Sequence, residues 1–308
     1  MDQTEVRQST SGATSGAEAI RAMNAAMEAA PEQAHGEPGS CPTCGAGAAS
    51  GPPSFVYALG RIEPRIPRLS VEKEFAQAMS NGEVAGQTDR HGMQTVLSMP
   101  ENRYLARQLC WVFTIEGMET YLIVPHDPGD LQRLIETVRP APSPTDLDVV
   151  IGARGPLAPP EMCNGLTVPI VAFDQLYSFD RDSLLKAIPS AEKGSREKLA
   201  AAGAEVIDRI MLMADNAGAT DDHRALNYLA VRYPAIYHTA AEMYARNASL
   251  SALETRPSAL SSTRKIVDVI FSYTDRTTAV AEKQFCRVDV TEEFPFLVTK
   301  LSPYYDRI

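Results

Sequence analysis

The sequence predicts an α+β fold with mixed or antiparallel sheets and several helices. Strand-like segments occur early, in the middle and at the end of the chain, without the regular strand–helix alternation of a doubly wound sheet. The clearest strands, 110–115 and 120–124, are rich in β-branched and aromatic residues and flank "EGME", which predicts a hairpin. Two long helical patterns lie between about 195 and 246.

The first half of the chain adds shorter elements around this hairpin. "SFVYALGRI" (54–62) reads as a strand that stops at Pro64 and Pro67, and Ser70 stands where it could cap a helix over 71–80. Apolar periodicity and proline punctuation predict three more helices, near 93–99, 102–109 and 131–138.

Two further strands are expected before the long helices. "DLDVVIGARGPL" (146–157) reads as a strand, although the glycines and prolines of "GARGPLAP" favour a turn there. The strand "GLTVPIVAFDQLYSF" (165–179) is interrupted by Pro169, which indicates a sheet edge or a bulge. An edge strand near 166–173 could accept an extended peptide.

The second half begins with helical patterns and ends in strands. A short helix is expected over 180–188. A long one over 195–215 would have Leu199, Val206, Ile210 and Met213 on one face. The next would start at a Thr220 cap and run towards Arg246 with a kink at Pro234. The last segments expected to be strands are 265–275, 282–291 and 294–301.

Composition divides the chain near residue 50. Residues 1–50 contain no aromatic residue and are rich in Ala, Gly, Ser and Glu, which predicts a disordered or partly helical arm. Residues 51–308 contain every aromatic side chain and are expected to form the folded domain, either as one body or as two lobes, 51–190 and 191–308.

Charge and hydropathy exclude several classes of partner. The formal net charge is −10, and no run of basic residues with interleaved aromatics is present, so we expect no nucleic-acid partner. No apolar stretch approaches the ~20 residues that span a bilayer, and the first residues do not resemble a signal peptide. We therefore expect a cytoplasmic protein with reduced thiols and no membrane association.

The common catalytic motifs are missing from the sequence. It contains no dinucleotide-binding or phosphate-binding glycine motif, no zinc-protease helix and no nucleophile elbow. His126 and Asp127 follow a strand and precede Asp130, so this loop could form an acid–base or metal site. The other reading is an ordinary turn stabilised by aspartate side chains.

Cys41 and Cys44 form a Cys-x-x-Cys pair in "SCPTCG". Such a pair can supply half of a structural zinc site, act as a redox dithiol, or have no chemical role. A zinc site would need two more ligands, which the fold would have to supply from Cys110, Cys163, Cys286 or a histidine. The sequence is therefore compatible with a bound zinc ion and with no cofactor.

Four blocks of the chain, taken in order, resemble a known family. They are "CPTCG…SFVYALGRI", "WVFTIEGMETYLIVPHDP", "RALNYLAVRYPAIY" and "FCRVDVTEEFPFLV". Over about residues 40–308 they are similar to the C-terminal domain of unknown function in the PatG and PatA proteins of cyanobactin biosynthesis. In that family the domain is fused to subtilisin-like proteases that cut and macrocyclise ribosomal peptides.

The resemblance implies a role in peptide maturation, with two departures from the family. The Asp, His and Ser motifs of a subtilisin are missing here. The family's second cysteine pair falls in the loop that here reads "RPSALSSTR" (256–264), so zinc ligands would shift to Cys286 or Cys163.

We expect a non-catalytic accessory domain that binds a precursor peptide or a maturation enzyme. The alternatives are a peptide-modifying enzyme, with zinc as one form of it, and a structural module that forms a homodimer.

Overall fold

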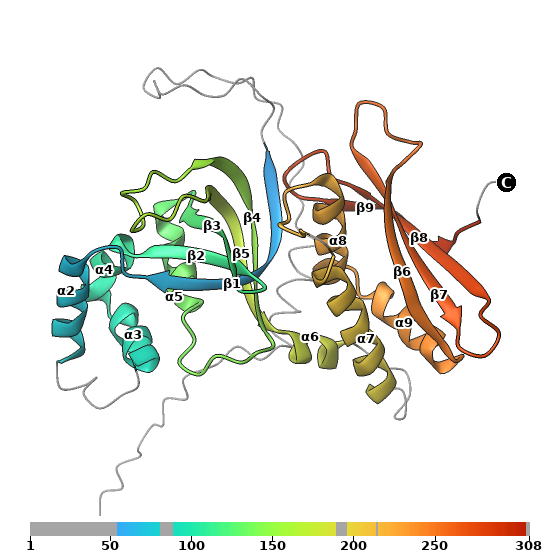
Figure 1. Ribbon diagram of the computed structural model, residues 1–308, viewed down its shortest axis with the longest axis horizontal. Helices are drawn as coiled ribbons and strands as arrows, with labels where there is room; N and C mark the ends of the chain where they lie inside the picture. The colour runs from blue at the N-terminus through green and yellow to red at the C-terminus, as the bar shows by residue number, and fades with distance from the viewer. Residues whose placement is uncertain (1–53, 81–88, 189–195, 214, 306–308) are drawn as a thin grey trace, which may run out of the picture. The chain divides into compact units, whose positions relative to one another are not determined.

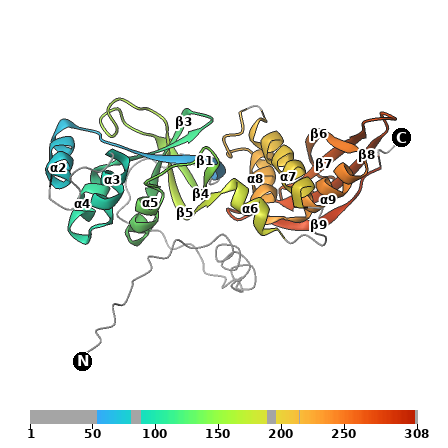
Figure 2. The same ribbon diagram turned by 90° about the horizontal axis from the view of Figure 1, so that it is seen from below.

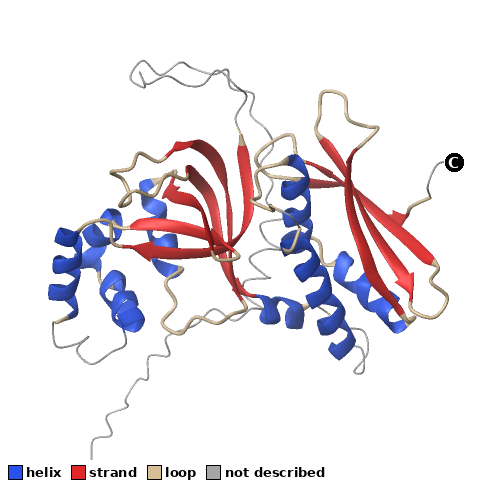
Figure 3. Ribbon diagram, viewed as in Figure 1, coloured by secondary structure: helices blue, strands red, loops and turns tan. Residues whose placement is uncertain are grey.

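The structure is a computed structural model of the chain and describes residues 54–80, 89–188, 196–213 and 215–305. These residues belong to one unit, Gly51–Ile308. They form eight α-helices and two sheets, one mixed and one antiparallel, which confirms the predicted α+β class. Figure 3 shows the strands of the two sheets as separate groups. The expected arm and the Cys41/Cys44 pair lie outside the described residues.

The first sheet is a closed five-stranded barrel in the order β1-β2-β3-β5-β4. Long β1 joins its two halves, since residues 61–65 pair with β2 and residues 55–60 pair with β4. The predicted hairpin is confirmed as the β2–β3 pair. The strands are β1 (Phe55–Arg65), β2 (Cys110–Ile115), β3 (Met118–Pro125), β4 (Asp146–Leu157) and β5 (Pro169–Asp180).

The connectivity of this barrel is that of the OB-fold. All neighbouring strands are antiparallel except β3 and β5, which run parallel, and a helix lies between β3 and β4. OB-type barrels bind ligands at the face of strands 2 and 3 and through the loops between strands 1 and 2 and strands 4 and 5. The topology therefore directs attention to that side of the barrel.

Alternation along β2 and β3 separates the inside of the barrel from its outside. Trp111, Phe113, Tyr121 and Ile123 belong to the main core. Their neighbours on the opposite face, including Val112 and Leu122, pack in a second, smaller cluster. The aromatic side chains of β2 and β3 are therefore buried in the core.

Short helices are grouped beside the barrel. Three lie between β1 and β2 and one follows β3, and Figures 1 and 2 both show the first three side by side with α5 next to them. The predicted Ser70 cap is wrong, because the helix begins at Leu69 with Arg68 at its N-cap and no side-chain cap bond. The helices are α2 (Leu69–Met79), α3 (Asp89–Ser98), α4 (Arg103–Gln108) and α5 (Leu131–Glu136).

The second sheet is antiparallel in the order β6-β7-β8-β9, with helices packed on one face (Figure 1). Its central strand β7 is almost continuously buried, as expected for a strand with neighbours on both sides. The elements of this half are α6 (Arg181–Ala187), α7 (Arg196–Met211), α8 (Asp221–Arg232), α9 (Ala235–Ala245), β6 (Ala248–Pro257), β7 (Ile266–Asp275), β8 (Ala281–Asp289) and β9 (Phe296–Pro303).

The predicted kinked helix over 221–246 is two separate helices, α8 and α9. Tyr233 leaves the helical conformation and Pro234 becomes the N-cap of α9, because proline has no N–H to continue the hydrogen-bond ladder. The predicted Thr220 cap is confirmed, since its side chain accepts a 3.1 Å hydrogen bond from the backbone N–H of His223.

Two predictions about strands are wrong. The strand after Pro169 is not an edge, because β5 is paired with β4 on one side and with β3 on the other. The strand predicted over 146–157 is confirmed as β4, whereas the turn favoured for "GARGPLAP" is wrong, because the first six of these residues continue β4 to Leu157. Gly152 permits this where the strands approach closely, since a Cβ there would lie 2.1 Å from the carbonyl oxygen of Ala172. Barrel closure, which short-range patterns do not encode, removes the predicted edge.

The barrel and α8 are joined by buried backbone and amide hydrogen bonds. At residues 55–60 β1 lacks β2 as a partner, and the chain before α8 takes its place. The N–H of Tyr57 donates to the carbonyl of Gly218 at 2.9 Å, and the Asn227 amide donates to the carbonyl of Tyr57 at 2.7 Å. Asn216 holds the Asn227 side chain at 2.8 Å. This junction orders the two halves as one unit.

Candidate functional site

His126 forms an imidazole–carboxylate pair with Asp174, a residue that the sequence patterns did not indicate. His126 follows β3, and its backbone N–H donates to the carbonyl of Phe173 on β5. This places its Nδ1 2.9 Å from Oδ1 of Asp174. The His126 side chain is 66% exposed. Such a pair can orient an imidazole and move a proton, but it is open to solvent.

Asp127 has the turn role that sequence analysis kept as the other reading. Its carboxylate accepts a 2.7 Å hydrogen bond from the backbone N–H of Gly129 and caps the short 3-10 turn Pro128–Asp130. Asp130 in turn pairs with Arg133 at 3.0 Å. The His126 imidazole pairs with Asp174, while the Asp127 carboxylate caps its own turn, so the structure replaces the expected His126–Asp127 pairing with His126–Asp174.

A second carboxyl group, that of Glu293, faces the pair from the loop between β8 and β9. Burial, the hydrogen bond to Asp174 and the charge of Asp174 together raise the pKa of Glu293 to about 7, against the opposing effects of His126 and Arg224. Arg224, almost fully buried, fixes this loop by donating to the carbonyls of Val290 at 2.7 Å and Glu293 at 3.1 Å. The cluster therefore connects the barrel with the loop that precedes β9.

Glu293 should make stability depend on pH. Between its ordinary pKa near 4.5 and its folded pKa of about 7, the folded chain holds a proton that the unfolded chain releases, so stability falls as pH rises through this window. We expect Glu293→Gln to be more stable than wild type at pH 8 by on the order of 1 kcal/mol, with no difference near pH 4.5.

Urea unfolding at the two pH values measures this difference. Glu292→Gln, at the exposed neighbouring position, is the control for the loss of one negative charge. An equal gain in both variants at pH 8 would contradict the assigned role of Glu293.

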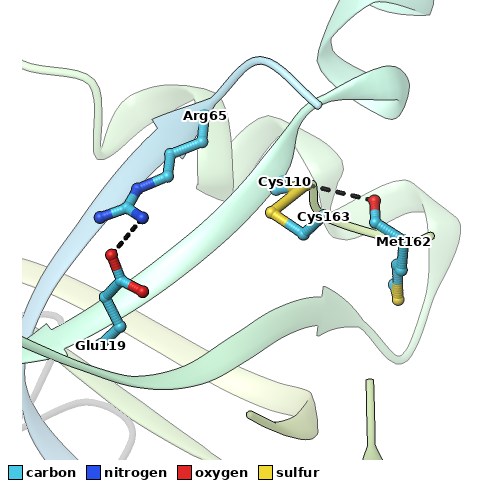
Figure 4. The surroundings of a disulfide bond; sticks show 5 residues. All are labelled: Arg65, Cys110, Glu119, Met162 and Cys163. Carbon is cyan, nitrogen blue, oxygen red and sulfur yellow. Dashed lines mark hydrogen bonds and ion pairs between the residues drawn. A yellow bond between two sulfur atoms is a disulfide. The ribbon is translucent and has the colours of Figure 1, made fainter. Parts of the chain in front are cut away.

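The cysteines differ from the sequence expectation. Cys110 and Cys163 form a disulfide with Cα atoms 5.9 Å apart, so reduced thiols are wrong for this pair (Figure 4). Cys163 is thereby committed to Cys110 and does not serve as a zinc ligand in this structure. Cys286 is free and buried, and burial raises its pKa to about 12.

A metal site within the described residues has no support. No group of three or more His, Cys, Asp or Glu side chains there could hold a metal ion. Cys41 and Cys44 lie outside those residues, so their zinc site stays a prediction.

The disulfide fixes a loop over the outer face of β2 and β3. The loop between β4 and β5, residues 158–168, is closed by a 2.8 Å hydrogen bond from Ala158 N–H to the Val168 carbonyl. Ala158 and Cys163 pack with Cys110, Val112 and Leu122 in the smaller apolar cluster. The covalent bond and this cluster together hold the loop in place.

Beside this loop lies an apolar pocket of about 470 Å³. Its walls come from the ends of the β1–β2 connection, from β2 and β3, from the start of α5, and from the β4–β5 loop. Apart from α5, these are the elements that form the ligand face of an OB-type barrel. Its lining residues are Pro67, Arg68, Ala106, Arg107, Gln108, Leu109, Cys110, Trp111, Leu122, Ile123, Val124, Pro125, Pro128, Leu131 and Met162. We call it the barrel pocket.

The polar side chains of the barrel pocket are few and mostly cationic. Arg68, Arg107 and Gln108 line it and are exposed. In the described part of the chain, neither of the two guanidinium groups is held by an ion pair or hydrogen bond. By contrast, the nearby Arg65 is paired with Glu119 (Figure 4). Two available cations therefore border an apolar hollow.

Sequence reasoning did not find the barrel pocket. Arg68 and Arg107 are separated by 39 residues and stand in segments that read only as helix ends. Asp174 and Glu293 were also missed, because each lies in a strand or loop pattern with no motif around it. The signal available in the sequence was the single tryptophan, Trp111, which lines the pocket.

Comparisons with known proteins place this fold. Residues 193–304 match the family model described as PatG C-terminal. The solved structure titled "PatG Domain of Unknown Function" is similar with a TM-score of 0.65 and 21% identity, over 82% of this chain and 98% of that chain. A search of curated proteins gives no match. No helix among the described residues has the length and apolarity needed to cross a membrane.

The structural likeness extends well before the matched sequence segment and covers the barrel as well as the second sheet. The resemblance inferred from the sequence blocks is therefore confirmed: residues 193–304 carry the sequence pattern of the PatG C-terminal family, and the chain has the fold of the PatG domain of unknown function.

Proposed function

We propose that this protein is an accessory domain of ribosomal-peptide maturation, of the cyanobactin type, that binds a precursor peptide or a maturation enzyme without itself performing the chemistry. The likeness to the PatG domain supports the pathway. The observation that carries the binding role is the barrel pocket, an apolar hollow on the side of an OB-type barrel where such barrels take ligands.

The structure supports peptide binding over nucleic-acid binding at this barrel. OB-type barrels bind single strands by stacking bases on exposed aromatic side chains along a basic groove. Here the aromatic side chains of β2 and β3, Trp111, Phe113 and Tyr121, are at most 4% exposed. The formal charge of −10 also opposes a phosphate backbone.

The His126–Asp174–Glu293 cluster has a structural role in this proposal. Its members come from the residue after β3, from β5 and from the loop before β9, and Arg224 anchors that loop to α8. None of the three lines the barrel pocket. We propose that the cluster holds the two halves of the domain together while binding takes place on the barrel.

Binding of a cyanobactin-type precursor peptide tests the proposal. We expect a labelled precursor to bind the full chain in a fluorescence anisotropy titration. Mass spectrometry of the same mixture should show an unchanged precursor mass. A defined mass shift on the precursor would assign an enzymatic role instead, and no binding by either the precursor or the maturation enzymes would contradict an accessory role.

A further inference from the structure

We propose that the barrel pocket recognises an acidic peptide segment in which a large apolar side chain stands next to one or more Glu or Asp residues. This inference rests on the proposed function and specifies its site and ligand chemistry.

The walls of the pocket fit one large apolar side chain. Four of the lining side chains are held in place by core packing and are each less than 10% exposed. They are Leu109, Trp111, Ile123 and Leu131. A hollow of about 470 Å³ lies within the ~300–1,000 Å³ range of ligand sites. Met162 is 39% exposed and adds a flexible thioether that adapts to different side-chain shapes. Leu, Ile, Met and Phe side chains are therefore the expected anchors.

The rim of the pocket selects negative charge. Arg68 stands at the N-cap of α2 and Arg107 in the last turn of α4, and both line the hollow. Because neither guanidinium group has a partner among the described residues, each can bind a carboxylate with two parallel hydrogen bonds. These two exposed guanidinium groups therefore favour an acidic segment at this place, because they lie closer to a bound carboxylate than the screened surface charges that give the chain its net charge of −10.

The neighbouring Gln108 suits a peptide more than a simple amphipathic acid. Its carboxamide can both donate to and accept from a main-chain amide, which a peptide offers beside each side chain. A fatty acid offers a carboxylate and an apolar tail but no amide. We therefore assign a peptide as the occupant.

The chain contains a built-in reporter for this site. Trp111 is its only tryptophan and lines the barrel pocket. Its indole N–H donates to the carbonyl of Ala106 at 3.1 Å, at the position where α4 meets the pocket. A ligand in this pocket should change the tryptophan emission, while a ligand bound elsewhere should leave it unchanged.

The test uses the full chain and a short labelled Gly/Ser peptide that carries one Phe flanked by two Glu. We expect binding seen by anisotropy together with a change in tryptophan emission. Replacing Phe by Ala, or both Glu by Gln, should each weaken binding about tenfold or more. Arg107→Glu should lower the affinity for the acidic peptide to a similar degree. The same variant should bind a peptide with Lys in place of Glu more tightly than wild type does.

Arg246→Glu is the matched control, because Arg246 is an exposed arginine at the C-cap of α9 and does not line the barrel pocket. Equal loss of affinity in Arg107→Glu and Arg246→Glu would overturn the site. Binding of a precursor without any change in tryptophan emission would also overturn the site and leave the proposed function standing. Binding of decanoate but of no peptide would overturn the assigned ligand class.

Discussion

Gly218→Ala is expected to lower the free energy of unfolding by about 3 kcal/mol or more, because the new methyl group has no space and the backbone is strained. Gly218 has φ +72°, a conformation that favours glycine. A Cβ there would lie 2.3 Å from the carbonyl oxygen of Tyr57 and 2.7 Å from Cα of Ala58. These are backbone atoms of β1 that cannot rotate away. The substitution should separate β1 from the segment before α8.

Gly117→Ala is the matched control for backbone strain alone. Gly117 lies in the β2–β3 turn with φ +81°, and a Cβ there would meet no atom within 4 Å. Its replacement should lower the free energy of unfolding by about 1 kcal/mol, because alanine is strained in a left-handed backbone conformation. Urea unfolding of both variants therefore isolates the clash at β1. Equal losses in the two variants would show that the contact between Gly218 and Tyr57 is not as close as described.

Loss of the Cys110–Cys163 disulfide is expected to cost about 2–4 kcal/mol, because the bond closes a long loop in the unfolded chain. The two cysteines are 53 residues apart. Cys163→Ala should also weaken peptide binding, since Met162 lines the barrel pocket next to Cys163. Urea unfolding and the anisotropy titration measure the two effects separately.

Wild type treated with a reducing agent is the control for this variant. It should lose the same stability and the same affinity, while Cys163→Ala should no longer respond to the reductant. Cys286 does not confuse the comparison, because it is free and buried in both proteins. If reduction left both the stability and the affinity of wild type unchanged, the bond would have no role in holding the β4–β5 loop.

Local patterns predicted most of the elements, and long-range contacts explain the errors. The hairpin 110–124, the helix near 71–80 and the three last strands follow from periodicity and turn residues. Strand β6, by contrast, was missed because "ASLSALETRP" has small and polar residues and is a strand through its pairing with β7. Barrel closure likewise depends on the parallel pairing of β3 with β5, whose partners are about 50 residues apart.

The candidate site was harder to predict than the fold. Sequence reasoning selected His126 but paired it with Asp127, its chain neighbour, whereas the structure pairs it with Asp174 from β5. It also counted Cys163 as a metal ligand, because nothing in the sequence shows that Cys110 faces it across the outer side of β2. The barrel pocket combines five separate segments of the chain, so only the folded arrangement identifies it.

The most direct test of the central claim is hydrogen–deuterium exchange of the full chain with and without a bound precursor peptide. Added protection is expected at residues 106–111, 122–125 and 162, which line the barrel pocket, while β6 and β9 exchange as before. Protection along β9, with no change at the barrel pocket, would contradict the account and place the peptide on the edge of the second sheet.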